Sequence, residues 1–338
     1  MKKQIVFSML LAAASWQTVA AKEVGVAEGS VRDSLAFEAY WDSISVQFDL
    51  DEVVVTGTRT PKFLKDVPIQ TRVINAKELA KLDATNVQDL LQQELPGVEF
   101  SYAMNQQTHL NFSGFGGQGV LFLVDGERLA GETMDDVDFT RLNMDNVERI
   151  EIVKGAASAL YGSQAAGGVI NIITKRSQQP WTLQVNARYA KHNEQRYGAS
   201  FGLNRKHLNN MLTAHFNRID NYDVHSAANP ETRIISTVYG DKTLNVRDQL
   251  VWSPTENFHL TGRAGYFFRE TVRSVDQPER YRDFTGGLRM NWSISERDEL
   301  QASYAFDQYD KSDYQRITRL DIRDYSNVQN SFRLLYNH

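Results

Sequence analysis

Cysteine is absent from this 338-residue chain. A chain without cysteine can form neither a disulfide framework nor a cysteine-ligated metal site. An excess of positive charge is absent as well, because the formal net charge is -5. A nucleic-acid-binding protein needs a basic face, so this charge argues against that class. Long apolar runs are also missing: none reaches the roughly 18 residues of a membrane-spanning helix, although this test does not detect membrane strands, in which only alternate residues are apolar.

The HExxH motif of zinc-dependent hydrolases is missing too, and the seven histidines are scattered singly. We therefore predict no catalytic residues, no metal site and no cofactor, and we do not expect an enzyme. The length is sufficient for two domains.

The N-terminus has the pattern of a secretory signal peptide. Lys2 and Lys3 precede an apolar segment over Ile5–Ala14, and small residues over Val19–Ala21 form a cleavage site. We predict a signal peptide over residues 1–21, cleaved after Ala21. Residues 22–50 are acidic and weakly patterned, and we expect them to form an N-terminal arm.

Residues 67–124 have a mixed α/β pattern. Val67–Ile74 reads as a strand, and Thr85 and Gln88 have capping-box spacing before an apolar face. We therefore predict a helix over Thr85–Leu95, stopped by Pro96-Gly97. Three short strands are predicted to follow: Val98–Ser101, His109–Phe112 and Val120–Val124. The dipeptide Asp125-Gly126 after the last strand is a turn signal.

The stretch from Val147 to Arg176 reads as strand, glycine-rich loop and strand. Apolar residues alternate with charged ones over Val147–Lys154, and a β-branched run over Val169–Thr174 closes the stretch. Glycine is favoured where φ must be positive or where backbones approach closely. The glycines between the two segments therefore predict a compact loop held between paired strands.

This stretch, VERIEIVKG…LYGS…GGVINIITK, resembles the end of the plug domain in TonB-dependent outer-membrane receptors. The phrases LLQQELPGV and VLFLVDGERL resemble the same plug in order and spacing. The resemblance implies an α+β plug domain over residues 61–176. It also implies that residues 22–50 are a periplasmic arm.

Residues 51–60, DEVVVTGTRT, resemble the TonB box of that family. The resemblance implies that TonB binds the six residues Asp51, Glu52, Val53, Val54, Val55 and Thr56. An extended peptide of this kind can add itself as a strand to a partner's sheet edge. The pattern alone favours the first strand of the plug, whereas the resemblance favours the TonB box, and the alternative stays open. We expect the segment to be exposed and only loosely packed on the plug.

Residues 177–338 alternate between apolar and polar residues with a period of two. Eight such segments run from Trp181 to Tyr336, with aromatic residues near their ends. Short connections alternate with long ones, which we expect at Asn221–Asp241, Thr271–Arg282 and Asp310–Asp324. These features predict an antiparallel transmembrane β-barrel. Plugged transporters use about 22 strands, so we expect residues 177–338 to be the N-terminal part of a truncated barrel.

The resemblance implies TonB-dependent active transport of a scarce ligand across the outer membrane. Partners would be TonB with its energising inner-membrane complex, outer-membrane lipid, and an iron complex such as haem or a siderophore. Haem is the first prediction because the sequence looks most like haem and colicin-type receptors, and a ferric siderophore or cobalamin is the alternative. Five residues are predicted at the plug apex, where His and Tyr can ligate haem iron: Tyr102, Met104, Gln106, His109 and Met134.

Two hypotheses of other kinds stay open. A passive porin or adhesin would need neither the TonB box nor the plug. A truncated, non-functional receptor fragment would have a folded plug without a complete barrel.

Overall fold

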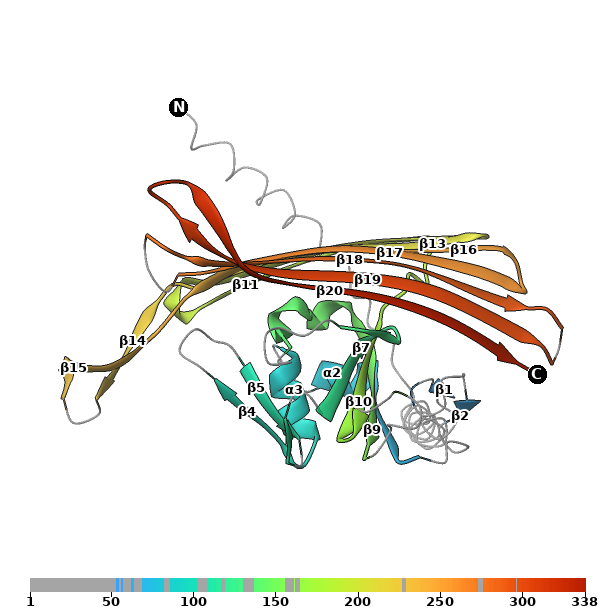
Figure 1. Ribbon diagram of the computed structural model, residues 1–338, viewed down its shortest axis with the longest axis horizontal. Coiled ribbons are helices and arrows are strands. Elements are labelled where there is room, and N and C mark those ends of the chain that lie inside the picture. The colour runs from blue at the N-terminus through green and yellow to red at the C-terminus, as the bar shows by residue number, and fades with distance from the viewer. Residues whose placement is uncertain are drawn as a thin grey trace, which may run out of the picture. The chain divides into compact units, whose positions relative to one another are not determined.

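The computed structural model describes residues 53–54, 56, 62–63, 69–81, 86–102, 108–112, 114–116, 119–129, 137–155, 161, 165–226, 229–272, 276–295 and 297–338. The predicted signal peptide and N-terminal arm lie outside the described residues. Among the described helices, none has both the length and the apolar character needed to cross a membrane. The described chain forms a mixed α/β domain followed by a long antiparallel sheet (Figure 1).

A five-stranded mixed sheet forms the centre of the α/β domain, in the order β3-β9-β10-β7-β8. Its strands are β3 (Thr71–Ile74), β7 (Val120–Val124), β8 (Glu127–Arg128), β9 (Val147–Lys154) and β10 (Gly168–Thr174). Strand β10 runs parallel to β7 and antiparallel to β9. The two paired strands predicted within residues 147–176 are therefore confirmed, whereas most of the predicted loop between them lies outside the described residues.

Two helices, α2 (Ala76–Lys81) and α3 (Val87–Glu94), belong to the same domain. Helix α3 is the predicted helix, but it begins later than predicted. Its N-cap is Asn86, whose side chain accepts a hydrogen bond from the Asp89 amide at 2.7 Å. Asparagine is at least as good a cap as threonine, so the adjacent residue takes the role that we assigned to Thr85.

The remaining elements of the domain are short. Strands β4 (Val98–Tyr102), β5 (Thr108–Phe112) and β6 (Phe115–Gly116) form a three-stranded sheet, and β1 (Val53–Val54) pairs with β2 (Lys62–Phe63). Two 3₁₀ turns, η5 (Phe139–Arg141) and η6 (Met144–Asn146), lead into β9. Side chains from α3, β4, β5, β7, β9 and β10 share one apolar core.

The second part of the chain is an eight-stranded antiparallel sheet, as predicted. Its strands are β11 (Trp181–Ala190), β12 (Glu194–Arg205), β13 (Leu208–Arg218), β16 (Asp241–Thr255), β17 (Phe258–Thr271), β18 (Glu279–Ser293), β19 (Glu299–Gln315) and β20 (Leu320–Asn337). The 3₁₀ turn η8 (Lys191–Asn193) joins the first two.

The predicted long connections have more structure than expected. The connection over residues 221–241 contains a hairpin of β14 (Tyr222–Ser226) and β15 (Asn229–Val238). The loop predicted over Asp310–Asp324 is wrong, because β19 and β20 continue through it to a turn over residues 316–319. Cross-strand ion pairs, such as Lys311 with Asp324 at 3.0 Å, help to hold these strand ends together.

The two faces of this sheet differ as the alternation predicts. Leu183, Phe332 and other large apolar side chains of one face are exposed, by 63% and 80% for these two. Polar side chains of the opposite face, including Thr213, His215 and Asn245, are buried. We call this second face the inner wall, because hydrogen bonds and ion pairs connect it to the α/β domain.

One contact between the domain and the inner wall centres on Arg141. Its side chain is fully buried and pairs with Asp283 at 2.7 Å and Asp307 at 3.0 Å. Burial acts to lower the pKa of Arg141, but the two carboxylates outweigh it and raise the pKa. The guanidinium also lies 5.0 Å from the ring centre of Tyr309. Arg247 donates to the Arg141 carbonyl at 3.0 Å, so the backbone of η5 is held as well.

A second contact centres on Asp138, the N-cap of η5. Its carboxylate accepts hydrogen bonds at 3.1 Å from both Arg269 and the Tyr309 hydroxyl. Burial acts to raise the pKa of Asp138, but the charge of Arg269 and hydrogen bonds from Thr140 and Arg269 lower it overall. The segment that enters β9 is therefore fixed by buried charge pairs to strands β17–β19.

We predict that Gly168→Ala destabilises the domain. Gly168 has φ of 150°, and a Cβ there would lie 2.6 Å from the Val153 carbonyl oxygen. The free energy of unfolding should fall by more than about 1 kcal/mol, measured by urea denaturation. The control is Gly116→Ala, where nothing lies closer than 4.0 Å and the change should stay within about 0.5 kcal/mol. Equal losses in both variants would contradict the steric argument.

Arg141→Met should cost about 3–5 kcal/mol of unfolding free energy, because it leaves two buried carboxylates without their cation. Calorimetry or urea denaturation of the full chain measures the loss. Arg72→Met is the control, since Arg72 pairs with Glu94 while 41% exposed and should cost at most about 1 kcal/mol. A loss for Arg141→Met no larger than that of the control would contradict a buried anchor.

The contribution of Asp138 should depend on pH. Because its folded-state pKa lies below the ordinary value of 3.8, its ionisation stabilises the fold fully above that pH and progressively less as pH falls below it. Asp138→Asn should therefore cost about 2 kcal/mol at pH 7, and the gap from the parent chain should narrow at pH 3. Urea denaturation of both chains between pH 3 and 7 tests this, and a constant gap would refute it.

Candidate functional site

The predicted TonB box is paired with the chain that follows it. Val53 and Val54 form β1 and lie opposite Phe63 and Lys62 of β2 in antiparallel register. The predicted residues Asp51, Glu52 and Val55 lie outside the described residues. Three consecutive valines favour an extended backbone, which accounts for the local conformation.

Thr56, at the end of the box, is completely buried. Its amide and its hydroxyl both donate to Glu151 Oε2, at 2.8 and 2.6 Å. The hydroxyl also accepts from Asn171 Nδ2 at 2.9 Å, and its carbonyl accepts from the Tyr161 hydroxyl at 3.0 Å. Our prediction of an exposed, loosely packed segment is therefore wrong at Thr56. The reason is that every polar group of this residue finds a partner in the α/β domain.

Neighbouring strands bring the partners of Thr56 together. Glu151 on β9 lies directly opposite Asn171 on β10, so their side chains share one face of the sheet. Arg149, two residues before Glu151 on the same face, pairs with Glu151 Oε1 at 2.9 Å. Sequence reasoning missed these residues, although an asparagine within the β-branched run of β10 is a detectable signal.

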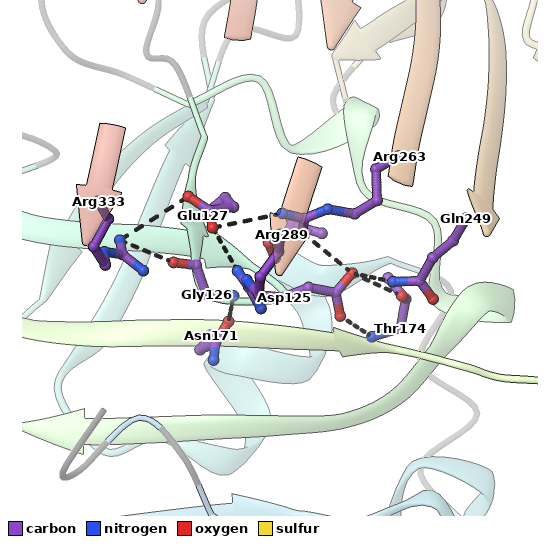
Figure 2. Close-up of polar contacts among 10 residues, drawn as sticks. Asp125, Gly126, Glu127, Asn171, Thr174, Gln249, Arg263, Arg289 and Arg333 are labelled. Atoms are coloured by element: carbon purple, nitrogen blue, oxygen red, sulfur yellow. Dashed lines mark hydrogen bonds and ion pairs between the residues drawn. The ribbon is translucent and has the colours of Figure 1, made fainter. Parts of the chain in front are cut away.

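A second polar cluster surrounds the tight turn between β7 and β8 (Figure 2). Asp125 and Gly126 have φ of 51° and 80°, and Val124 pairs with Glu127 across the turn. Positive φ at both central residues is the geometry of a type I′ hairpin, which favours the sequence Asp-Gly. The turn predicted at Asp125-Gly126 is therefore confirmed, and it projects two carboxylates.

Three arginines of the inner wall converge on this turn, as Figure 2 shows. Arg289 donates to the Asp125 carbonyl at 2.6 Å and also pairs with Glu127. Arg263 lies 3.8 Å from the Asp125 carboxylate and 3.6 Å from that of Glu127. Arg333 donates to the Gly126 carbonyl at 3.5 Å. Strands β17, β18 and β20 thus hold one two-residue turn.

Hydrogen bonds from β10 complete the cluster. The Asp125 carboxylate accepts from the amide and the hydroxyl of Thr174, at 2.9 and 2.8 Å. The Gly126 amide donates to Asn171 Oδ1 at 3.0 Å. Asn171 therefore contacts both the turn and Thr56.

A cavity of about 100 Å³ lies between the turn and the inner wall, lined in part by Asp125, Glu127, Gln249 and Arg263. Ligand pockets usually measure roughly 300–1,000 Å³, so this space is too small for the predicted ligands. In the part of the chain that the structure describes, no group of three or more His, Asp or Glu side chains could hold a metal ion.

The structure describes only two of the five residues predicted at the plug apex, Tyr102 and His109. His109 on β5 is exposed and lies opposite Ser101 of β4, while Tyr102 lies opposite Thr108. Met104, Gln106 and Met134 lie outside the described residues. The described chain therefore does not assemble a ligand site from this set, and the five residues stay a prediction.

Comparison with known proteins identifies the α/β domain. The family TonB-dependent Receptor Plug Domain matches residues 64–169. The vitamin B12 transporter BtuB of Vibrio vulnificus is 37% identical over 130 residues, which are 38% of this chain and 21% of that protein. BtuB of Photobacterium profundum is 34% identical over 125 residues, 37% of this chain and 20% of that protein.

Solved structures share the fold over more of the chain. The ferric enterobactin receptor PfeA of Pseudomonas aeruginosa superposes with a TM-score of 0.60 at 19% identity, covering 83% of this chain and 46% of that chain. The siderophore receptor PirA of Acinetobacter baumannii gives a TM-score of 0.58 at 19% identity, covering 79% and 44%. The chain thus spans under half of these receptors. The matched proteins are named transporters and receptors, and the family match shows that residues 64–169 of this chain are a TonB-dependent receptor plug domain.

Proposed function

We propose that this chain acts in TonB-dependent uptake of a scarce metal-containing compound across the outer membrane. The observation that carries the proposal is the plug domain with the end of an extended N-terminal segment bound to it through Thr56. In this proposal residues 51–60 are the TonB box, residues 61–176 the plug, and residues 177–338 part of the barrel. The exposed apolar face of the sheet contacts lipid, and residues 22–50 reach the periplasm after removal of residues 1–21.

The proposed TonB site is the backbone of residues 51–56. Strand β1 contributes only two described residues, Val53 and Val54, to its pairing with β2. A short strand that exchanges its β2 partner for the edge of a TonB sheet keeps its extended conformation and its backbone hydrogen bonds. TonB with its inner-membrane complex is the proposed partner.

The ligand that we propose first is a cobalamin. Its support is the 34–38% identity over the matched region to proteins named vitamin B12 transporters. A ferric siderophore is the second candidate, although the likeness to siderophore receptors is one of fold. The haem prediction keeps as support only the sequence resemblance given above and the residues Tyr102 and His109, because none of the matched proteins named above is a haem receptor. A passive porin or adhesin would not require a TonB box bound to a plug, so we do not propose that function.

Val54→Pro should weaken TonB binding, because proline removes a backbone donor that strand addition requires. We expect at least a tenfold weaker affinity of the full chain for the periplasmic domain of TonB, measured by isothermal titration calorimetry. Val54→Ala keeps the amide and should bind within about threefold of the parent. Parent-like binding by Val54→Pro would exclude residues 51–56 as the TonB site.

Equilibrium binding distinguishes the proposed ligands. Cyanocobalamin, ferric enterobactin and haem are each titrated into the detergent-solubilised full chain, with binding followed by intrinsic fluorescence. We expect the tightest binding for cyanocobalamin. Tighter binding of either iron compound would reassign the ligand while leaving the transport class intact.

A further inference from the structure

We infer that Asn171 is the positioning residue that couples the inner wall of the sheet to the TonB box. The inference rests on the proposed function, because it takes Thr56 to be the end of that box. Its basis is a continuous set of contacts from wall arginines, through the Asp125-Gly126 turn and one side chain, to Thr56.

The amide of Asn171 can bond both partners in only one orientation. Its Oδ1 accepts from the Gly126 amide at 3.0 Å, and its Nδ2 donates to Thr56 Oγ1 at 2.9 Å. A backbone N–H can only donate, so a flipped amide would place two donors against each other at Gly126. The side chain is 2% exposed, and water therefore does not replace either partner readily.

On the wall side, three arginines contact the turn. Arg289 and Arg333 bond the carbonyls of Asp125 and Gly126, and Arg263 pairs with the carboxylates on either side of Gly126. Because the turn has only two central residues, a shift of β17 or β18 relative to the plug displaces the Gly126 amide. That displacement acts directly on Asn171 Oδ1.

The hydrogen bonding of Thr56 in the proposed TonB box also depends on Asn171. The single hydroxyl proton of Thr56 is donated to Glu151 Oε2, so the oxygen is left to accept from Asn171 Nδ2. When Asn171 moves with the turn, this buried acceptor loses its donor. The bound position of Thr56 is then disfavoured relative to a solvated one. Movement of the wall is thereby converted into release of the box.

Thiol labelling tests the inference, because the chain has no cysteine of its own. Val54→Cys supplies one thiol, and its reaction rate with a maleimide measures release of the box in the detergent-solubilised full chain. Asn171→Leu should raise the rate about tenfold, and Arg289→Met should raise it at least threefold. In the Asn171→Leu background, Arg289→Met should add nothing, since the connection is already broken.

Arg269→Met is the matched control. Arg269 is also an inner-wall arginine that pairs with a plug carboxylate, Asp138 at 3.1 Å, but Asp138 does not touch the 125–127 turn. Its labelling rate should equal that of the parent. Parent-like labelling of Asn171→Leu, or equal acceleration by Arg269→Met and Arg289→Met, would overturn the inference.

A second pair of variants covers the case in which Asn171→Leu fails to fold. Thr56→Val removes the hydroxyl that Asn171 bonds and lies outside the sheet, so it should label as fast as Asn171→Leu. Thr56→Ser keeps the hydroxyl and should label at the parent rate. Slow labelling of Thr56→Val would overturn the inference. The assay uses neither TonB nor a ligand, so its outcome is independent of the TonB titration with Val54→Pro.

Discussion

The arrangement of this protein depends on buried and half-buried pairing between plug carboxylates and arginines of the sheet. Asp138 meets Arg269, and the Asp125-Gly126 turn meets Arg263 and Arg289. Such pairs add little net stability when compared with well-packed apolar residues, because desolvation offsets most of the attraction. Breaking one is nevertheless expensive, since a charge is left without a partner. The pairs therefore specify where the plug sits on the sheet.

At Arg141 the charges of this interface are reversed, because the cation belongs to the plug and the carboxylates belong to the sheet. Arg141 is a plug cation between two sheet carboxylates, Asp283 and Asp307, whereas Asp138, only three residues earlier, pairs with a sheet arginine. Alternation of sign within one short segment excludes sliding of the plug along the sheet, because a displaced register would oppose like charges. The 3₁₀ turn η5 is thus held in one position, and it leads through η6 directly into β9.

Strand β9 connects this interface to the proposed TonB box. Its residue Glu151 holds Thr56 through two hydrogen bonds and is itself oriented by Arg149. The neighbouring strand supplies Asn171, which reaches the arginine-bound turn. The plug therefore contacts the sheet at two places, η5 and the Asp125-Gly126 turn. The first leads into β9, which carries Glu151, and the second is bonded to β10, the strand next to β9. Of the two contacts, in the part of the chain that the structure describes, only the one at the Asp125-Gly126 turn reaches Thr56 through a side chain, Asn171.

Local pattern in the sequence determined the elements of this protein. Period-two alternation predicted the eight-stranded sheet, Asp125-Gly126 predicted a tight turn, and the apolar face after residue 85 predicted helix α3. These features depend on residues within one or two turns of each other. The resemblance of residues 147–176 to receptor plugs predicted the TonB-dependent receptor family.

Tertiary structure alone decided which polar residues are buried together. Arg141 and Asp283 are 142 residues apart, and Thr56 and Asn171 are 115 apart. Their charge or hydrogen-bonding capacity can be predicted from the sequence. The sequence pattern of a strand does not show, however, whether a polar side chain is exposed to water or buried against a partner. The long ends of β19 and β20 were missed for that reason, because ion pairs such as Lys311 with Asp324 stabilise them. Burial of Thr56 likewise follows from the register of β9 with β10, which no local pattern records.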